Sequence, residues 1–341
     1  MKIGVCGTGT IASWISDTIC QLENENIALY TCATSPGFVC DEFAAKYGYT
    51  KISGSFEELL QDPEVDLVYI ALPNHMHYEI CRRAIECGKH VVCEKPFSAD
   101  ERECGELLRA AHEKGVFISE ALWPVFLPAY RMIKEEIAAG TIGRLHSGTI
   151  RMMDNVMFLD RVKHLETGGG VLMDEGPYTL GCMTAVFGTD IKSLRSKTRK
   201  LDTGVDAEDE IWVEYQDGCR VHIHQSMDAA EAEQERYVEL EGTKGKIRMD
   251  AVANPDSVEI FDLEGQSVKR LEIPKQIRFR GMPPVSGYEY EWIAFEKAIE
   301  AGRKECAEIP GSVTLAIAHM MSQVLENAGI VFPFIGEKGI G

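Results

Sequence analysis

Apolar and polar positions in the first third of the chain alternate between two patterns. Short apolar runs, typical of buried strands, lie at residues 2–7, 27–33, 65–72, 90–93 and 116–121. Segments with the apolar spacing of amphipathic helices lie between them, at residues 10–22, 40–47, 77–87 and 99–114. The run at 65–72 is almost continuously apolar, as in a strand that is covered on both faces. This alternation predicts a parallel sheet with helices on both faces.

The pattern changes after residue 122, where polar and apolar residues alternate around tight turns. After a predicted helix at 129–139, we expect hairpins that pair 210–216 with 219–225, 236–241 with 246–250, and 257–263 with 267–273. Two closing helices, at 288–301 and 312–328, are expected to cover one face of this sheet. The sequence therefore predicts an α/β domain over residues 1–122 and an α+β domain over 123–341 with a large, mainly antiparallel open sheet.

A glycine turn joins the first predicted strand to the first predicted helix. It reads Gly7-Thr8-Gly9-Thr10-Ile11-Ala12. Gly7 permits the sharp turn, Gly9 lets the backbone approach a pyrophosphate, and Ala12 lets the helix pack closely on the strand. The helix N-terminus offers unpaired N–H groups and a positive dipole end to the phosphates. The turn predicts a Rossmann domain that binds a dinucleotide, and a tight turn that binds nothing is the alternative.

The end of the second predicted strand bears on the choice of cofactor. In NAD-binding domains an acidic residue there holds the ribose hydroxyls. This strand ends in Ala33-Thr34-Ser35-Pro36-Gly37, which contains neither an acid nor an arginine. Because no carboxylate repels a 2′-phosphate and the hydroxyls of Thr34 and Ser35 can donate to it, the sequence favours NADP and leaves NAD open.

Polar residues follow the third and fourth predicted strands, where open α/β sheets bind their ligands. Lys95 follows the fourth strand, and from there it can stabilise the negative charge that develops on a substrate oxygen during hydride transfer. His77, after the third strand, is expected near the nicotinamide or at the start of the next helix. A metal site at His75 and His77 is not expected, because their spacing suits a helix poorly and no third ligand is evident.

A glycine run leads into a further predicted helix at residues 168–178. Asp174 and Tyr178 are four residues apart, so on a helix they share one face. A lysine ammonium close to a phenol lowers its pKa, which makes Tyr178 a candidate proton donor. The alternative is a capping aspartate and a tyrosine of the core.

Composition narrows the classes of partner. The formal net charge is −19, from 54 acidic and 35 basic residues, so the surface repels nucleic acid and anionic membranes. No apolar run approaches the roughly 18 residues that cross a bilayer, and the N-terminus shows no signal peptide. The 11 cysteines are scattered without zinc-ligand spacing, as in a reducing compartment. We therefore expect a cytoplasmic protein that acts on a small molecule and binds no metal.

The order and spacing of these motifs resemble the glucose–fructose oxidoreductase/inositol dehydrogenase (Gfo/Idh/MocA) family over nearly the whole chain. The matching stretches are residues 7–12, 72–74 with His77, 88–96, 168–178 and the hairpin turn 242–245. The block 88–96, which ends in Glu94-Lys95-Pro96, is the most specific of them. The resemblance implies a Rossmann domain and a second domain whose open sheet often forms a dimer interface, so a homodimer or higher homo-oligomer is expected.

The resemblance also implies roles for individual residues. Lys95 would be the catalytic lysine, Asp174 its partner in orienting substrate, and residue 178 the acid/base. Many members have histidine at that place, whereas Tyr178 and the stretches 120–123 and 126–130 are most similar to the dihydrodiol dehydrogenase branch, whose members use NADP. The residues expected to bind the cofactor are Gly7, Gly9, Thr10, Ile11, Ala12, Thr34, Ser35, Leu72, Pro73, Asn74, His77, Glu94 and Lys95.

One departure concerns the substrate. The dihydrodiol dehydrogenase branch has Trp-x-Arg-Phe where this chain has Val125 between Trp123 and Phe126, which puts the same substrate in doubt but not the hydride chemistry. Trp123 and Phe126 either line the substrate pocket or pack between the domains. Basic residues before the glycine run are expected to form a solvated loop rather than substrate contacts, and they are Arg161, Lys163 and His164.

Together these features predict an NAD(P)-dependent oxidoreductase. It would transfer a hydride between the nicotinamide and the hydroxyl/carbonyl pair of a small sugar, polyol or cyclic diol. Lys95 would stabilise the oxygen, Tyr178 would supply the proton and Asp174 would hold the pair in place. The alternatives are a non-catalytic dinucleotide-binding regulatory protein and an NAD-retaining glycoside hydrolase of the same family, neither of which turns over added cofactor.

Overall fold

The computed structural model describes residues 1–22, 24–98, 100–275 and 287–335. Proximity of Cα atoms divides these residues into two compact units. The first unit holds Met1–Trp123 and the described residues of Lys275–Leu315. The second holds Pro124–Pro274 and the described residues from Ala316 onward. The chain therefore leaves the first unit after Trp123 and later returns to it.

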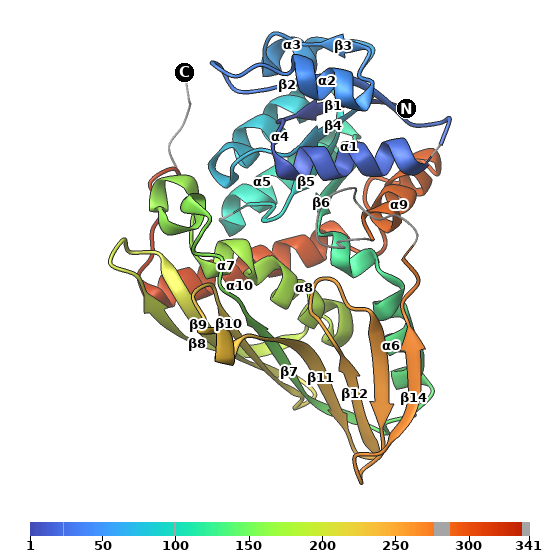
Figure 1. Ribbon diagram of the computed structural model, residues 1–341, viewed down its shortest axis with the longest axis vertical. Coiled ribbons are helices and arrows are strands. Elements are labelled where there is room, and N and C mark those ends of the chain that lie inside the picture. Colours follow the sequence, from blue (N-terminus) through green and yellow to red (C-terminus); the bar gives the residue numbers. More distant parts are fainter. Residues whose placement is uncertain (23, 99, 276–286, 336–341) are drawn as a thin grey trace. The chain divides into compact units, whose positions relative to one another are not determined.

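The first unit is built on a parallel sheet of six strands in the order β3-β2-β1-β4-β5-β6 (Figure 1). Its strands are β1 (Lys2–Cys6), β2 (Ala28–Ala33), β3 (Lys51–Ile52), β4 (Leu67–Ile70), β5 (His90–Glu94) and β6 (Ile118–Ala121). The order reverses between β1 and β4, and ligands of open α/β sheets bind beyond the carboxyl ends of the strands at such a point. The predicted parallel sheet is confirmed.

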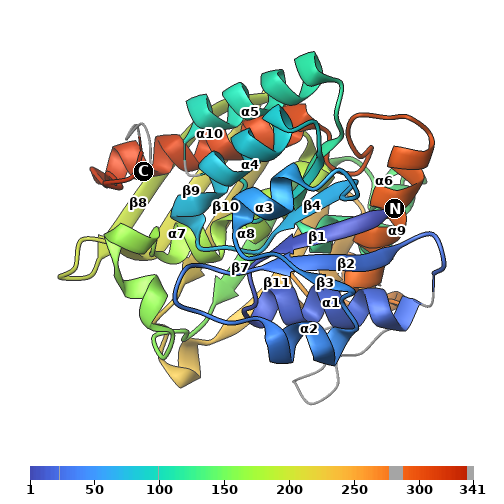
Figure 2. The same ribbon diagram turned by 90° about the horizontal axis from the view of Figure 1, so that it is seen from above.

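Helices cover both faces of the parallel sheet (Figure 2). On one face lie α1 (Thr10–Leu22) and α2 (Asp41–Tyr47), and on the other α3 (Phe56–Gln61), α4 (His77–Glu86) and α5 (Glu101–Lys114). The helix predicted at 99–114 corresponds to α5, and its predicted first residue lies outside the described residues. Neither β3 nor α3 was predicted, because a two-residue strand and a six-residue helix are too short for a repeated apolar pattern.

A further helix, α9 (Tyr288–Glu300), completes the first unit. We expected it to cover the antiparallel sheet, and this prediction is wrong, because the helix packs against α1. The ring of Tyr288 meets that of Trp14 edge to face, and Trp292 stacks on Tyr69 of β4 with 5.5 Å between ring centroids. The aromatic residues of α9 thus have their partners on the first unit.

The second unit is built on an eight-stranded sheet in the order β14-β13-β12-β11-β7-β10-β9-β8 (Figure 1). Its strands are β7 (Leu145–Met153), β8 (Ile191–Lys200), β9 (Asp206–Tyr215), β10 (Arg220–Ser226), β11 (Glu235–Gly242), β12 (Gly245–Met249), β13 (Ser257–Phe261) and β14 (Ser267–Glu272). Neighbouring strands are antiparallel except β7 and β10. The mainly antiparallel sheet and its hairpins β9–β10, β11–β12 and β13–β14 are confirmed.

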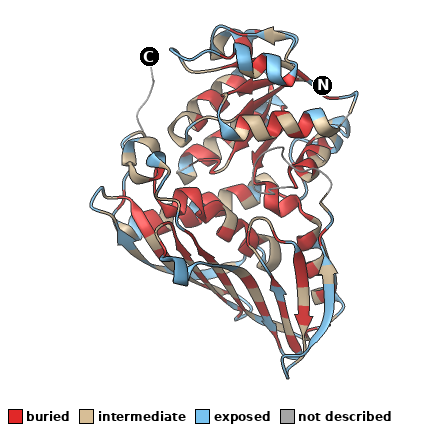
Figure 3. Cartoon of the chain, viewed as in Figure 1, coloured by how far each residue is buried: buried red, intermediate tan, exposed pale blue. Residues whose placement is uncertain are grey.

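Helices cover one face of the eight-stranded sheet. They are α6 (Pro128–Ala138), the short α7 (Val171–Asp174) and α8 (Gly176–Phe187), while α10 (Gly311–Ala328) begins in the first unit and ends in the second. Buried residues recur along the strands of this sheet (Figure 3). In β9, alternate residues are buried beneath these helices, and those between them, including Trp212, are only half-buried. The sheet thus has one core face and one polar face.

Three further observations bear on the class of protein. Among the described helices, none is both long and apolar enough to cross a membrane. All 11 cysteines fall within the described ranges, and each is a free thiol. The described residues also contain no group of three or more His, Cys, Asp or Glu that could hold a metal ion.

Candidate active site

The glycine turn leads from β1 into α1 at the carboxyl edge of the parallel sheet. Gly7 has a φ of +112°, and a Cβ there would lie 2.2 Å from the carbonyl oxygen of Ala71, so only glycine fits. An added Cβ at Gly9, by contrast, would meet nothing within 4 Å. The fold therefore does not require glycine at position 9, whereas a pyrophosphate approaching this backbone does. These residues fit a dinucleotide better than a turn that binds nothing.

The beginning of α1 and the end of β2 flank this turn. Thr10 and Ile11 open α1, and Ala12 behind them is fully buried, as close helix–strand packing requires. At the end of β2 the side-chain oxygens of Thr8 and Thr34 are hydrogen-bonded at 3.3 Å. Thr34 and the following Ser35 are half-buried, with no charged side chain between residues 34 and 39. A ribose or its 2′-phosphate at this place would meet hydroxyl groups.

His77 joins the ends of β4 and β5. It begins α4, directly after a 3-10 turn over Asn74–Met76, and only 1% of it is exposed. Its ring nitrogens lie 2.8 Å from the carbonyl oxygens of Leu72 and of Pro96. Burial lowers the pKa of His77, and the two carbonyl contacts oppose that change. His77 therefore fixes the loops at both strand ends from inside the unit.

Lys95 follows β5 directly and is half-buried, in a turn whose backbone is held by buried carboxylates. Its N–H donates to Oε2 of Glu94 at 3.2 Å, and the N–H of Phe97 donates to Oε1 of Glu120 at 3.1 Å. The Lys95–Pro96 peptide is cis. Together with the contact from the buried histidine, these bonds fix the backbone from which the lysine side chain projects.

Three buried glutamates belong to this region: Glu94, Glu120 and Glu291. Burial raises the pKa of Glu94 and of Glu120 to about 7, although the charge of Lys95 acts in the opposite direction. Burial also raises the pKa of Glu291 well above its usual value, and the charge of Glu94 adds to this. Neither carboxyl oxygen of Glu291 has a hydrogen-bond partner in the described part of the chain. Burial of the three carboxyl groups therefore favours their protonated forms, and the sequence analysis did not assign Glu120 or Glu291 to the site.

Asp174 and Tyr178 lie on either side of a helix break in the second unit. Asp174 is the last residue of α7 and Tyr178 is in the first turn of α8, so the prediction of one helix carrying both is wrong. Pro177 has no N–H to continue the helix, and the N–H of Tyr178 bonds to the carbonyl of Glu175 at 3.0 Å. Asp174 is buried and Tyr178 is half-buried.

Asp174 is paired with a residue that we expected to be solvated. Nη2 of Arg161 lies 2.9 Å from Oδ1 of Asp174, with 55% of the arginine side chain and 11% of the aspartate side chain exposed. The neighbouring Lys163 and His164 contact Asp160 instead. Arg161 is therefore part of the candidate site, and its position 13 residues before Asp174 gave no sign of the pairing.

Trp123 and Phe126 belong to different units. Trp123 is 3% exposed and stacks on Tyr288 at 4.8 Å between ring centroids, within the first unit. Phe126 is 8% exposed and belongs to the second unit, as does the buried Val125. Trp123 thus has a stacking partner within its own unit.

The expected site residues therefore form two groups, each described within its own unit. The first group lies at the carboxyl edge of the parallel sheet and contains the glycine turn with Thr34 and Ser35, the segment Leu72–Asn74 with His77, and Glu94 with Lys95. The helix break of the second unit collects Asp174, Tyr178 and Arg161.

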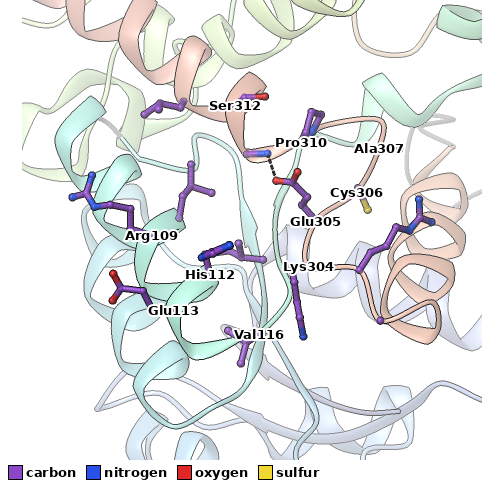
Figure 4. Close-up of a pocket in the computed structure, with 16 residues that line it drawn as sticks. Arg109, His112, Glu113, Val116, Lys304, Glu305, Cys306, Ala307, Pro310 and Ser312 are labelled. Atoms are coloured by element: carbon purple, nitrogen blue, oxygen red, sulfur yellow. Dashed lines mark hydrogen bonds between the residues drawn. The ribbon is translucent and has the colours of Figure 1, made fainter.

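A surface pocket of 770 Å³ lies elsewhere on the first unit (Figure 4). It is bounded by α5 and by the segment that leads into α10, where Glu305 Oε2 accepts a hydrogen bond of 2.8 Å from the N–H of Gly311. Its polar lining is exposed, including Arg109 and His112. None of the residues expected to bind cofactor or substrate lines it.

Curated relatives match almost the full length of the chain. Trans-1,2-dihydrobenzene-1,2-diol dehydrogenase of Bos taurus is 28% identical over 341 residues, which cover 98% of both proteins. The enzyme of the same name from Mus musculus is 26% identical over 348 residues, again covering 98% of both.

Solved structures share the fold. A 3-ketoreductase of Actinomadura kijaniata, KijD10, in complex with NADP and TDP-benzene, has a TM-score of 0.82 at 21% identity and covers 96% of this chain and 97% of its own. Levoglucosan dehydrogenase in complex with NADH and levoglucosan has a TM-score of 0.83 at 20% identity, with the same coverage.

Family profiles match both halves of the sequence. Residues 1–122 match the Gfo/Idh/MocA "Oxidoreductase family, NAD-binding Rossmann fold", and residues 130–248 match the "GFO/IDH/MocA C-terminal domain". Since these matches cover more than half of the chain, and the curated relatives are dehydrogenases, the protein is an enzyme that belongs to the Gfo/Idh/MocA family of NAD(P)-binding oxidoreductases.

Proposed function

We propose that this enzyme interconverts a hydroxyl and a carbonyl group on a small sugar, polyol or cyclic diol, with NADP as the preferred cofactor. The observation that carries the proposal is the turn at Lys95, which buried side chains hold rigidly at the carboxyl edge of the same sheet as the glycine turn. A lysine held there can act on a substrate oxygen beside a bound nicotinamide. The names of the relatives favour net redox chemistry over the regulatory and hydrolytic alternatives.

In the reducing direction, NADPH bound at the glycine turn would supply a hydride to the carbonyl carbon, and a proton must reach the carbonyl oxygen. We assign that proton to the hydroxyl of Tyr178, with Lys95 stabilising the developing negative charge on the oxygen. Asp174 orients the substrate, and its pairing with Arg161 limits the positions that its carboxylate can adopt. The products are the alcohol, the oxidised cofactor and the Tyr178 phenolate, which regains its proton from solvent, so atoms and charge balance.

The preference for NADP rests on the end of β2. Residues 34–39 offer the hydroxyls of Thr34 and Ser35 and no carboxylate, so a 2′-phosphate meets donors and no repelling charge. We expect tighter binding of NADPH than of NADH by calorimetric titration. Equal affinities, or tighter binding of NADH, would contradict this part of the proposal.

The experiment on the reaction itself is a substitution of the lysine. Lys95→Met should lower kcat by about a hundredfold or more, the scale seen when one group that stabilises a developing oxyanion is removed. Binding of NADPH should weaken far less than kcat falls, because the glycine turn is untouched. Lys114→Met, an exposed lysine at the end of α5, is the matched control. A panel of sugars, polyols and diols supplies the substrate, and near-normal turnover by the Lys95 variant would refute the assignment.

We further propose a cytoplasmic homodimer that forms through the polar face of the eight-stranded sheet. The described helices of the second unit pack on the opposite face, and this face carries half-buried aromatic rings, with Trp212 and His222 stacked at 5.2 Å between centroids. The free thiols suit a reducing compartment. Sedimentation velocity should report a dimer that Trp212→Glu dissociates. A monomeric parent protein would contradict the proposal.

A further inference from the structure

Two aspartates of β9, Asp206 and Asp209, are buried together beneath the helices of the second unit. Asp206 is 1% exposed and Asp209 is not exposed at all. Their side chains lie against one another, although they are three residues apart, because the pairing of β9 with β8 skips Ala207. Two carboxylates in contact inside a protein cannot both be ionised, since the repulsion and the lost hydration are too costly. One proton must therefore reside on the pair.

The surroundings of Asp209 show which carboxyl is ionised. Its Oδ1 accepts from the hydroxyl of Thr198 at 2.6 Å, and its Oδ2 accepts from Nε2 of Gln225 at 3.2 Å. Asp206, in contrast, has an Oδ1 that meets no donor in the described part of the chain. A proton on Asp206 makes its carboxyl group a donor to Asp209, which then accepts from three donors. Asp209 is thus the carboxylate and Asp206 the acid.

Asp206 holds the start of the helix that ends in Asp174. Its Oδ2 accepts from the N–H of Leu172, near the start of α7, at 2.5 Å. Gly170 packs directly on the same carboxyl, because a Cβ there would lie 2.0 Å from Oδ1 of Asp206. Gly170 also has a φ of +111°, which an L side chain adopts only under strain. The absence of a side chain at Gly170 therefore allows the backbone of the glycine run to pack directly on the carboxyl group of Asp206.

Asp209 is linked to α8 by hydrogen bonds through Gln225. The hydroxyl of Thr179, directly after Tyr178 in α8, lies 2.8 Å from Oε1 of Gln225, whose Nε2 contacts Asp209. Both Thr179 and Gln225 are fully buried. One polar network thus ties β9 to the helices on both sides of the break that separates Asp174 from Tyr178.

We propose that Asp206 and Asp209 share one proton and act as positioning residues, holding α7 and α8 so that Asp174 and Tyr178 keep the geometry that the reaction needs. This inference rests on the proposed function for its kinetic consequences, but not for its structural ones. Burial raises the pKa of Asp206 well above its usual value and raises that of Asp209 as well, in agreement with a shared proton.

The test uses isosteric substitutions that distinguish the acid from the carboxylate. In Asp206→Asn the amide can accept from Leu172 and donate to Asp209, so kcat should stay close to that of the parent enzyme. In Asp209→Asn an amide N–H₂ group replaces one carboxylate oxygen and faces a donor, either Thr198 or Gln225. The network should therefore rearrange, and kcat should fall about tenfold to a hundredfold, the cost of misplacing reacting groups by about 1 Å. Affinity for NADPH should not change in either variant, because the glycine turn lies in the other unit.

Hydrogen exchange of residues 171–179 without substrate gives a readout that does not depend on turnover. Exchange should accelerate in Asp209→Asn and remain slow in Asp206→Asn. If the parent enzyme turns over no substrate, the proposed function fails while exchange still decides the inference. Equal effects of the two variants on exchange would overturn the placement of the proton.

A milder variant covers the case in which Asp209→Asn does not fold. Thr179→Val keeps the shape of the side chain but removes its bond to Gln225, and it should lower kcat severalfold while cofactor affinity is retained. Parent-like kcat and parent-like exchange in Thr179→Val would overturn the positioning role.

Discussion

The buried carboxyl of Glu120 gives a prediction on pH and stability that the structure allows to be worked through. Glu120 is 2% exposed, and burial raises its pKa from 4.5 to about 7. A raised pKa means that the folded state binds the proton more tightly than the unfolded state does. The contribution of Glu120 to the free energy of unfolding is therefore highest below about pH 4.5 and declines as the pH rises to about 7.

The magnitude follows from the difference between the two pKa values. Each pKa unit corresponds to about 1.4 kcal/mol, so ionisation of Glu120 in the folded protein lowers the free energy of unfolding by about 3 kcal/mol above neutral pH. Glu120→Gln removes this titration, while its amide oxygen can still accept from the N–H of Phe97. The variant should gain stability over the parent as the pH rises, with little difference in acid and a gain of up to about 3 kcal/mol near pH 8.

The assay is urea unfolding of parent and variant at a series of pH values, followed by tryptophan fluorescence. Trp14, Trp123 and Trp292 lie in the first unit with Glu120, so the signal reports mainly on that unit. Glu113→Gln, an exposed glutamate of α5, is the control and should leave the pH dependence unchanged. A stability difference for Glu120→Gln that is constant with pH, or that shrinks as the pH rises, would refute the reasoning.

Other substitutions test the glycines and the arginine of the candidate site. Gly9→Ala should weaken NADPH binding by about tenfold or more in calorimetric titration, yet leave the unfolding midpoint unchanged, because the added Cβ meets no protein atom within 4 Å. Loss of stability with retained binding would contradict this. Gly170→Ala should destabilise the protein by about 1–3 kcal/mol or more. Its effect should exceed that of Gly218→Ala, since both glycines have positive φ but only Gly170 is crowded by neighbouring atoms. Similar unfolding midpoints for the two variants would argue against close packing of Gly170 on the carboxyl group of Asp206. Arg161→Met should lower kcat, by no more than about fivefold, because the ion pair between Arg161 and Asp174 is partly exposed. An unchanged kcat would show that Arg161 does not contribute to the site.

Much of the fold follows from periodicity, and the exceptions have physical causes. The helix predicted over residues 10–22 is α1 as the structure has it, because apolar positions recur there through several turns. The edge strand β8 was missed, since none of its ten residues is buried and basic side chains interrupt any alternation. The break between α7 and α8 was missed because the Asp174–Tyr178 spacing outweighed Pro177, although a proline within a helical pattern is itself a sign of a break.

The candidate site divides in the same way. Residues in continuous motifs, such as Gly9 and Lys95, could be recognised because neighbours in sequence carry the chemistry. Glu120, Arg161 and Asp206 act on partners at least 13 positions away, and only the folded chain reveals those pairs. The sequence did contain one indication that Glu120 is unusual. It interrupts an apolar run, so a charged residue must be buried at that position.

The return of the chain to its first unit has a consequence for how the protein can be divided. The profile match ends at residue 122, which invites expression of an N-terminal fragment as a free-standing dinucleotide-binding module. Such a fragment would lack α9, and with it the rings that cover Trp14 and Tyr69. The exposed aromatic surface would favour aggregation. Truncation, domain exchange and gene fusion should therefore treat residues 1–122 as a sequence module that depends on a distant helix to become a folding unit.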